Sequence, residues 1–143
     1  MYLTEHFTLS EMTVSESAAR LGIDNTPDAA ALANLHRLCT VLESVRLLVD
    51  KPVLVSSGYR SRALNSAIGG SLESAHIQGL AADINVPGLS AATLAQRVAD
   101  SPLRFDQLIL EYDQWVHLGL STTGERRQLL TIRRGSGYLP GLV

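Results

Sequence analysis

The stretch FDQLILEYDQWVHLGLS, residues 105–121, decides the fold, because it is either one long strand or two short ones. Strands average about five or six residues, and aspartate is common in turns. The stretch therefore predicts a hairpin, with strands over Gln107–Tyr112 and Trp115–Leu120. Its turn is expected around Asp113 and Gln114.

The segments around this hairpin predict one α+β domain that covers residues 1–143. Apolar residues at three- and four-residue steps predict a long helix from about Pro27 to Val49, with Thr26 as its cap. Early helices followed by later strands favour a small antiparallel sheet with the N-terminal helices packed on it. Short helices are expected at the capping-box patterns Thr8–Glu11 and Thr13–Glu16, over Arg62–Ile68 and over Ala91–Ala99. Further strands are expected over Pro52–Ser56, Ala81–Val86 and Gln128–Ile132, before a tail that contains glycine and proline.

The bulk composition is that of an ordinary globular protein. Of 143 residues, 45% are hydrophobic and 18% are charged, and the net charge is −2. This charge provides no overall field for nucleic acid or for an anionic membrane, so we expect neither partner. The single cysteine, Cys39, rules out an intramolecular disulfide and is expected in the core. One local basic cluster is interpreted as a solvated edge and comprises Arg126, Arg127, Arg133 and Arg134.

A second stretch, SAHIQGLAAD at residues 74–83, places His76 and Asp83 seven positions apart. On a continuous helix these residues would lie about 10 Å apart along the axis. On a continuous strand they would lie about 23 Å apart and point to opposite faces. Gly79 stands between them and permits the turn that would bring them together.

A third candidate partner is His117, in the second strand of the predicted hairpin. Catalytic zinc sites take three protein ligands from His, Asp, Glu or Cys and leave a fourth position for water. Two neutral imidazoles and one carboxylate leave the metal a net positive charge, which lowers the pKa of bound water toward about 7. On the residues alone, a structural alternative stays open: His76 and Asp83 could form a hydrogen bond or cap a turn without any metal.

Hydrolysis would also need a base, and Glu111 is the first candidate. If the stretch were one straight strand, Glu111 would lie about 20 Å from His117 and could not act with it. In a hairpin, Glu111 folds back beside the strand that carries His117. Asp113, at the turn, is the second choice.

Taken together, these motifs resemble the zinc D-Ala-D-Ala carboxypeptidase and endopeptidase family, which cuts peptidoglycan stem peptides and shares its fold and metal set with hedgehog signalling domains. The resemblance extends from His6 to about Ser121. It is carried by SGYRS at residues 57–61, Asn65, Gly69-Gly70, the residues from Ser74 to Asp83, and Trp-x-His at residues 115–117. The segments HFTLSEMT and GIDNTP resemble the N-terminal segments of compact family members found in phages and prophages.

The resemblance implies zinc as the cofactor, with His76, Asp83 and His117 as its ligands. It also implies that Arg60 holds a substrate carboxylate, as a planar guanidinium does through two hydrogen bonds. Ser74 matches a hydroxyl that helps to hold the substrate. Trp115 is expected either to wall the substrate pocket or to belong to the core, and we favour the pocket wall.

The sequence departs from the family at Gln114, where many members carry the catalytic carboxylate. An amide cannot accept a proton from water. The hedgehog pattern instead places a glutamate six residues before the second histidine, which is the position of Glu111 here. Glu111 is therefore preferred as the base, and Asp113 stays in reserve.

We expect a zinc peptidase that hydrolyses stem peptides, of either the D-Ala-D-Ala carboxypeptidase or the L-Ala-D-Glu endopeptidase type. The first residues, MYLTEHFTLSEM, have neither the basic nor the apolar segment of a secretory signal. We therefore expect synthesis in the cytoplasm and action on the cell wall after phage lysis or from a virion. The alternative is a non-catalytic binding or phage structural module that keeps the zinc and the fold.

Overall fold

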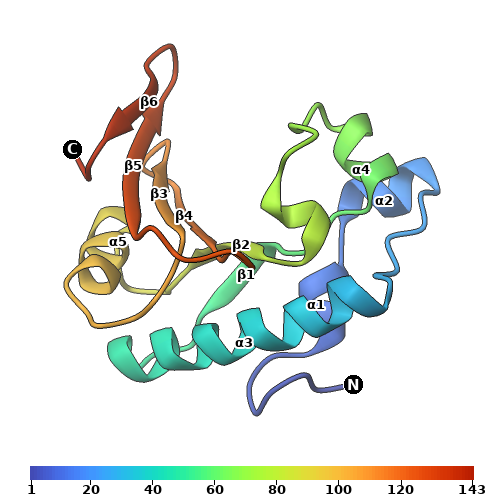
Figure 1. Ribbon diagram of the computed structural model, residues 1–143, viewed down its shortest axis with the longest axis horizontal. Helices are drawn as coiled ribbons and strands as arrows, with labels where there is room; N and C mark the ends of the chain where they lie inside the picture. Colours follow the sequence, from blue (N-terminus) through green and yellow to red (C-terminus); the bar gives the residue numbers. More distant parts are fainter.

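The hairpin forms, and it lies at the centre of the sheet (Figure 1). In the computed structural model, which describes all of residues 1–143, strand β3 (Gln107–Glu111) pairs antiparallel with β4 (Trp115–Gly119). Glu111 pairs directly with Trp115, so the turn has three residues and begins at Tyr112, one residue earlier than predicted. Tyr112 and Asp113 both have φ of 56°, a left-handed conformation that allows this tight return.

The sheet has six strands in the order β1-β2-β4-β3-β5-β6. The prediction of an α+β fold is confirmed, but the sheet is mixed, because β3 and β5 are parallel while all other neighbours are antiparallel. The chain leaves β4 and crosses the end of β3 before it enters β5, and this crossing makes the two strands parallel. The other strands are β1 (Leu54–Ser57), β2 (Ala81–Asn85), β5 (Gln128–Arg133) and β6 (Gly137–Pro140), of which only β1 and β6 lie at the edges of the sheet. Strand β6 arises from the tail in which no strand was predicted.

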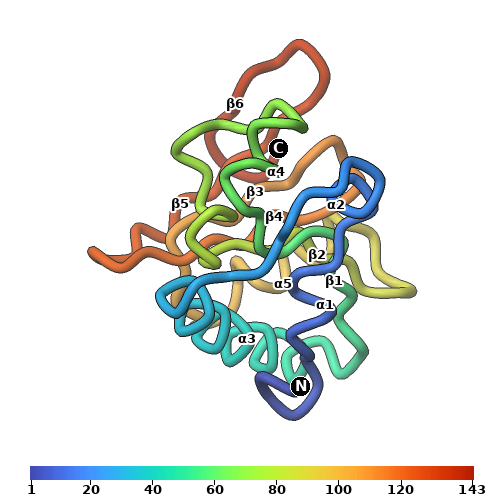
Figure 2. The backbone as a smooth tube through the Cα atoms, turned by 90° about the vertical axis from the view of Figure 1, so that its right-hand side faces the viewer, coloured from blue at the N-terminus to red at the C-terminus, as the bar shows by residue number.

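The chain also has six helical segments. They are α1 (Leu9–Thr13), α2 (Glu16–Leu21), α3 (Ala29–Val49), α4 (Arg62–Ala67), the 3₁₀ helix η1 (Ala75–Gln78) and α5 (Ala91–Ala99). Figure 2 shows the chain turned by 90°, with α3 toward one end of the molecule and the tip of the β5–β6 hairpin toward the other. No helix combines the length and the apolar character that crossing a bilayer requires.

The helix caps correct two details of the sequence interpretation. Thr8 and Glu11 form the predicted capping box. Helix α2, however, is capped by Ser15 rather than by Thr13, whose hydroxyl donates to the Leu9 carbonyl within α1. Each cap hydroxyl or carboxylate accepts a bond from one of the free N–H groups in a first turn.

The long helix α3 begins two residues later than predicted. Asp28, not Thr26, is its N-cap, and the Asp28 carboxylate accepts from the Ala31 N–H. Thr26 instead donates to Asp24 in the preceding turn. The apolar stripe of α3 is buried as expected, and Cys39 is fully buried within it.

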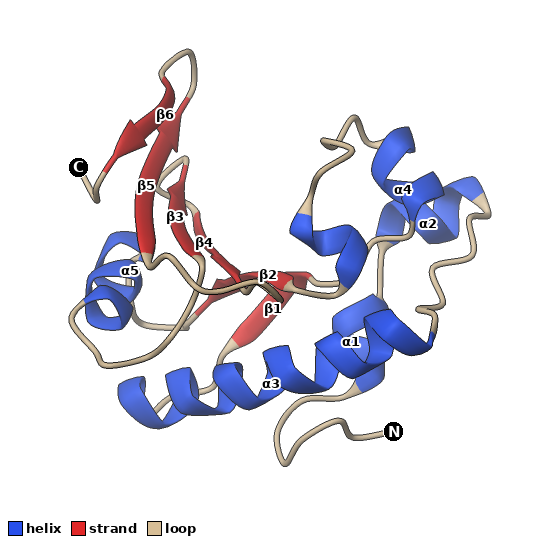
Figure 3. Cartoon of the chain, in the orientation of Figure 1, coloured by secondary structure: helices blue, strands red, loops and turns tan.

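The two faces of the sheet differ in character. One face is apolar and packs on α5, which in turn packs on α3 (Figure 3). Strand alternation places the core side chains on this face, namely Ala82, Ile84, Leu108, Leu110, Val116 and Leu118. The same alternation turns Asp83, Glu111 and His117 to the opposite face, toward η1.

Gly79 fixes the distance between η1 and α3. It ends η1 with φ of 73°, and a Cβ at this position would lie 2.6 Å from the Ala31 carbonyl oxygen of α3. A side chain here would meet both backbone strain and a steric clash. Gly79 therefore supplies the predicted turn and also lets the His76 segment approach the core.

We predict that Gly79→Ala lowers the free energy of unfolding by about 1–2 kcal/mol for left-handed strain and by about 1–3 kcal/mol more for overpacking. Gly22→Ala is the matched control, because Gly22 has φ of 66° but no atom within 4 Å of an added Cβ. Chemical denaturation of both variants measures the difference. Equal losses would contradict a packing role for Gly79.

Candidate metal centre

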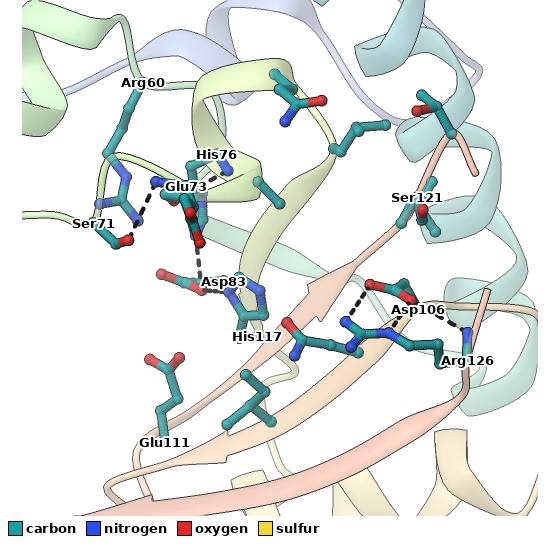
Figure 4. A pocket seen from close by; sticks show the side chains of 18 of the residues that line it. Arg60, Ser71, Glu73, His76, Asp83, Asp106, Glu111, His117, Ser121 and Arg126 are labelled. Atoms are coloured by element: carbon teal, nitrogen blue, oxygen red, sulfur yellow. Dashed lines mark hydrogen bonds and ion pairs between the residues drawn. The ribbon is translucent and has the colours of Figure 1, made fainter. Parts of the chain in front are cut away.

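The three residues predicted as metal ligands meet on the polar face of the sheet, which is the face toward η1. His76, Asp83 and His117 each offer a ligand atom, and these atoms all lie within 4.8 Å of one another. His76 comes from η1, Asp83 from β2 and His117 from β4. Figure 4 shows the three side chains pointing toward one another.

Strand register accounts for two of these residues. Asp83 and His117 are direct cross-strand partners in the antiparallel β2–β4 pair, so their side chains point to the same face. The Asp83 Oδ1 atom lies 3.1 Å from the His117 Nδ1 atom. The contact between these two side chains therefore depends on the β2–β4 pairing and not on the position of η1.

The third residue, His76, is oriented by the backbone. Its Nδ1 lies 2.7 Å from the Gly58 carbonyl oxygen, so Nδ1 carries the proton and donates, while Nε2 keeps its lone pair. Nε2 lies 3.4 Å from Asp83 Oδ1. Histidine ligands commonly donate their second ring N–H in this way, which fixes both the tautomer and the ring.

The two separations at the Asp83 carboxylate fit a tetrahedral zinc site. Ligand atoms about 2.0–2.1 Å from a tetrahedral zinc lie about 3.3 Å from each other. The two nitrogen–oxygen separations at Asp83 Oδ1, 3.1 and 3.4 Å, bracket this value. The donor set, two imidazoles and one carboxylate, is also one that catalytic zinc uses.

The protonation states suit a metal as well. Burial lowers the pKa of His76, which favours the neutral imidazole that can act as a ligand. Burial alone would raise the pKa of Asp83, but the hydrogen bond with His117 and the nearby His76 ring outweigh it and hold the pKa well below its usual range. The carboxylate is therefore ionised.

Glu111 faces the same cavity as the three donors. Its partner Trp115 lies two residues before His117 on β4, a step of about 7 Å along the strand. Burial, followed by the charge of Asp83, raises the pKa of Glu111 above that of an ordinary glutamate. An enzyme base is commonly tuned in this direction, because it must both accept and return a proton near neutral pH.

Trp115 and Asp113 lie outside the cavity. The Trp115 Nε1–H donates to Glu111 Oε2 at 2.9 Å, so the indole holds the carboxylate in place and does not wall the pocket. The Asp113 carboxylate, at the exposed turn, is paired with Arg133. The structure therefore brings Glu111 to the site and leaves Asp113 outside it.

Arg60 and Ser74 also line the cavity, which has a volume of about 590 Å³. The Arg60 Nη1 atom donates to Asn65 Oδ1 at 3.3 Å, while its Nε is buried without a partner. A buried unpaired donor is costly, so an acceptor that reached Arg60 Nε would relieve that cost. The Ser74 Oγ accepts from the His76 N–H at 3.2 Å, which leaves the hydroxyl proton free.

The sequence interpretation assigned no role to Asn65, which lies behind Arg60, or to several residues that line the cavity. Asn65 is fully buried, where it positions Arg60 and donates to the Ser71 carbonyl at 2.8 Å. Tyr138 reaches the cavity from β6, in register with Ile132 and, through it, with Glu111. Alternation along β3 could have identified Gln107 and Ile109 as neighbours of Glu111 on one face. Nothing in the sequence pattern could have identified Tyr138, because its pairing spans three strands.

A mixed sheet that holds a His–Asp–His set with zinc spacing, beside a carboxylate with a raised pKa, has the features of a zinc metallopeptidase. Comparison with known proteins supports this class. The model of the family described as "Peptidase M15" matches residues 5–119, and the chain belongs to this family.

A curated relative gives the same indication. Over 71 residues the chain is 38% identical to the zinc D-Ala-D-Ala carboxypeptidase of Streptomyces albus G. The matched segment covers 48% of this chain but only 28% of that protein, so the chain spans well under half of its relative. The family and the donor set both indicate zinc as the metal.

We predict that the purified chain binds one zinc ion and that Asp83→Asn abolishes this binding. At a free zinc concentration 100 times Kd, binding should stabilise the wild type by about 2.7 kcal/mol. Elemental analysis and thermal unfolding with and without a chelator measure both effects. His36→Gln is the control, because His36 bonds the Leu3 carbonyl outside the centre. A wild type without zinc affinity would favour the purely structural alternative.

Proposed function

We propose that the chain is a zinc peptidase that hydrolyses peptide bonds in peptidoglycan stem peptides. The observation that carries the proposal is the shared cavity. It brings three donor atoms, all within 4.8 Å of one another, together with Glu111 and with Arg60, whose Nε lacks a partner. The family and the named activity of the Streptomyces relative support a peptidoglycan substrate.

In this proposal, zinc held by His76, Asp83 and His117 supplies Lewis acidity toward a carbonyl oxygen and lowers the pKa of water. Glu111 accepts a proton from the attacking water and returns it to the leaving amine nitrogen. The Trp115 N–H keeps one oxygen of Glu111 occupied, so the other oxygen is the one that faces the reaction.

Arg60 binds a substrate carboxylate through its free donors, and Asn65 keeps the guanidinium in place. The hydroxyl of Ser74 donates to the substrate backbone from the start of η1. Both groups stand on segments fixed by backbone bonds, since the Arg60 N–H donates to the His76 carbonyl at 3.1 Å. This hydrogen bond therefore links Arg60, which would bind the substrate, to His76, which would bind the metal.

We predict that Glu111→Gln lowers kcat for stem-peptide cleavage by about 10²- to 10⁴-fold while zinc stays bound, because an amide cannot accept the proton. Mass analysis of products from digested sacculi identifies the bond that is cut, and metal analysis checks the zinc.

Asp113→Asn is the control for this experiment and should retain nearly full activity, because an exposed ion pair contributes at most about 1 kcal/mol to stability. A greater loss in Asp113→Asn than in Glu111→Gln would transfer the role of base to Asp113. If the wild type cleaves no stem peptide, the non-catalytic binding module replaces the enzyme.

A second prediction concerns Trp115. Trp115→Phe removes the hydrogen bond to Glu111 but keeps an aromatic ring, so kcat should fall by about 10- to 100-fold, as expected for loss of about 1.5–3 kcal/mol at a charged acceptor. The acidic limb of the kcat profile should also move to higher pH, because the bond from Trp115 lowers the pKa of Glu111. An unchanged pH profile would show that Trp115 has only a packing role.

A further inference from the structure

The cavity continues past the donor triad, toward the loop between β4 and β5. Figure 4 shows Arg60 on one side of the triad and the Arg126–Asp106 pair on the other. This second end is lined almost entirely by polar side chains, namely Asp106, Gln107, Ser121, Thr122, Thr123 and Arg126. Most of them lie beyond residue 119, where the family match ends.

Arg126 makes three hydrogen bonds to Asp106 at this end. Its Nε and Nη2 donate to the two Asp106 carboxylate oxygens at 2.8 and 2.9 Å, and its backbone N–H donates to Oδ1 at 3.2 Å. The Asp106 side chain is only 15% exposed, whereas that of Arg126 is 61% exposed. The mostly buried Asp106 carboxylate therefore holds the Arg126 guanidinium in place. The Nη1 atom of Arg126 keeps free donors for a further acceptor.

The surroundings of Arg126 are positively charged. A neighbouring pocket shares Ser121 and Thr122 with the cavity and is lined by three more arginines and one glutamate: Arg37, Arg104, Arg127 and Glu125. Arg37 is paired with Glu125, while Arg127 donates only to backbone carbonyls. Around the shared residues Ser121 and Thr122, the two pockets together carry four arginines and two carboxylates. This end of the cavity favours an anion.

We propose that the Arg126 end of the cavity is a carboxylate-binding subsite, so that the substrate carries a carboxylate on each side of the bond that is cut. The inference rests on the proposed function and deepens it. Arg60 takes the carboxylate on one side of the donor triad, and Arg126 takes the carboxylate on the other. The basic cluster that the sequence analysis treated as one solvated edge therefore has members in different places. Arg126 belongs to the cavity, while Arg133 pairs with Asp113 at the hairpin turn.

The geometry also gives the distance between the donor triad and the Arg126 end of the cavity. Asp106 lies three residues before Ile109, the strand partner of His117, which is about 10 Å along the strand. An extended peptide covers that distance in about three residues. The second carboxylate should therefore lie about three residues from the bond. In a stem peptide, the D-Glu carboxylate meets this condition when the D-Ala-D-Ala bond is cut, but not when the L-Ala-D-Glu bond is cut.

The test compares two forms of one stem pentapeptide ending in D-Ala-D-Ala. One form has all its carboxylates free, and the other keeps only the terminal carboxylate while the remaining ones are carboxamides. Binding to zinc-loaded Glu111→Gln is measured by calorimetry, so that no cleavage intervenes. We expect the amidated peptide to bind about tenfold more weakly, because it loses a charge-assisted bond to Arg126.

Adding Arg126→Gln should abolish the difference between the two peptides. Arg134→Gln removes the same charge from an exposed site outside the cavity, so it should leave the difference intact. Because Arg126 also ties its loop to Asp106, the residue before β3, Arg126→Lys is a second variant that keeps the charge and should restore part of the discrimination.

Equal affinity of the two peptides for Glu111→Gln would overturn the inference. Cleavage by the wild type between L-Ala and D-Glu would also overturn it, while leaving the proposed peptidase function in place. Absence of any cleavage would remove the peptidase function, yet tenfold discrimination in the binding experiment would still support a carboxylate subsite at Arg126.

Discussion

The site depends on one register, the pairing of Asp83 with His117 across β2 and β4. A slip by one residue would turn every side chain of one strand to the opposite face, sending a charged group into the core and an apolar one to the cavity. The apolar residues that flank each ligand prevent that slip, because Ala82, Ile84, Val116 and Leu118 are all fully buried. Hydrophobic burial thus specifies the geometry of a polar centre.

The remaining parts of the site are attached to this pair by backbone contacts. The Gly58 carbonyl fixes the His76 ring, and the His76 carbonyl accepts from the Arg60 N–H. Gly58 itself lies so close to α1 that a Cβ would come 2.5 Å from the Met12 carbonyl oxygen. The N-terminal helix, the turn that carries Arg60 and the third donor therefore form one connected unit, in which a shift of any part would move the others.

Much of this arrangement follows from local sequence signals. The hairpin was predictable because polar residues interrupt two apolar runs, and the three donors because few histidines exist and one glycine permits the turn. Cap positions were less certain, since Asp28 and Thr26 both suit a helix start and only tertiary packing selects between them. The orientation of Trp115 depends on a cross-strand neighbour that spacing alone does not reveal. Strand β6 was missed because its glycine and its proline disfavour a strand until β5 supplies a partner.

The parallel pairing of β3 with β5 has a further consequence. Every proposed metal ligand and Glu111 lie within residues 5–119, whereas Arg126 and Tyr138 are contributed by the segment that follows. That segment is added at the margin of a sheet whose inner strands already hold the ligands. Its loops can thus change in length or charge without altering the chemistry at the centre, and relatives that share the catalytic strands need not share a preference for the same peptide.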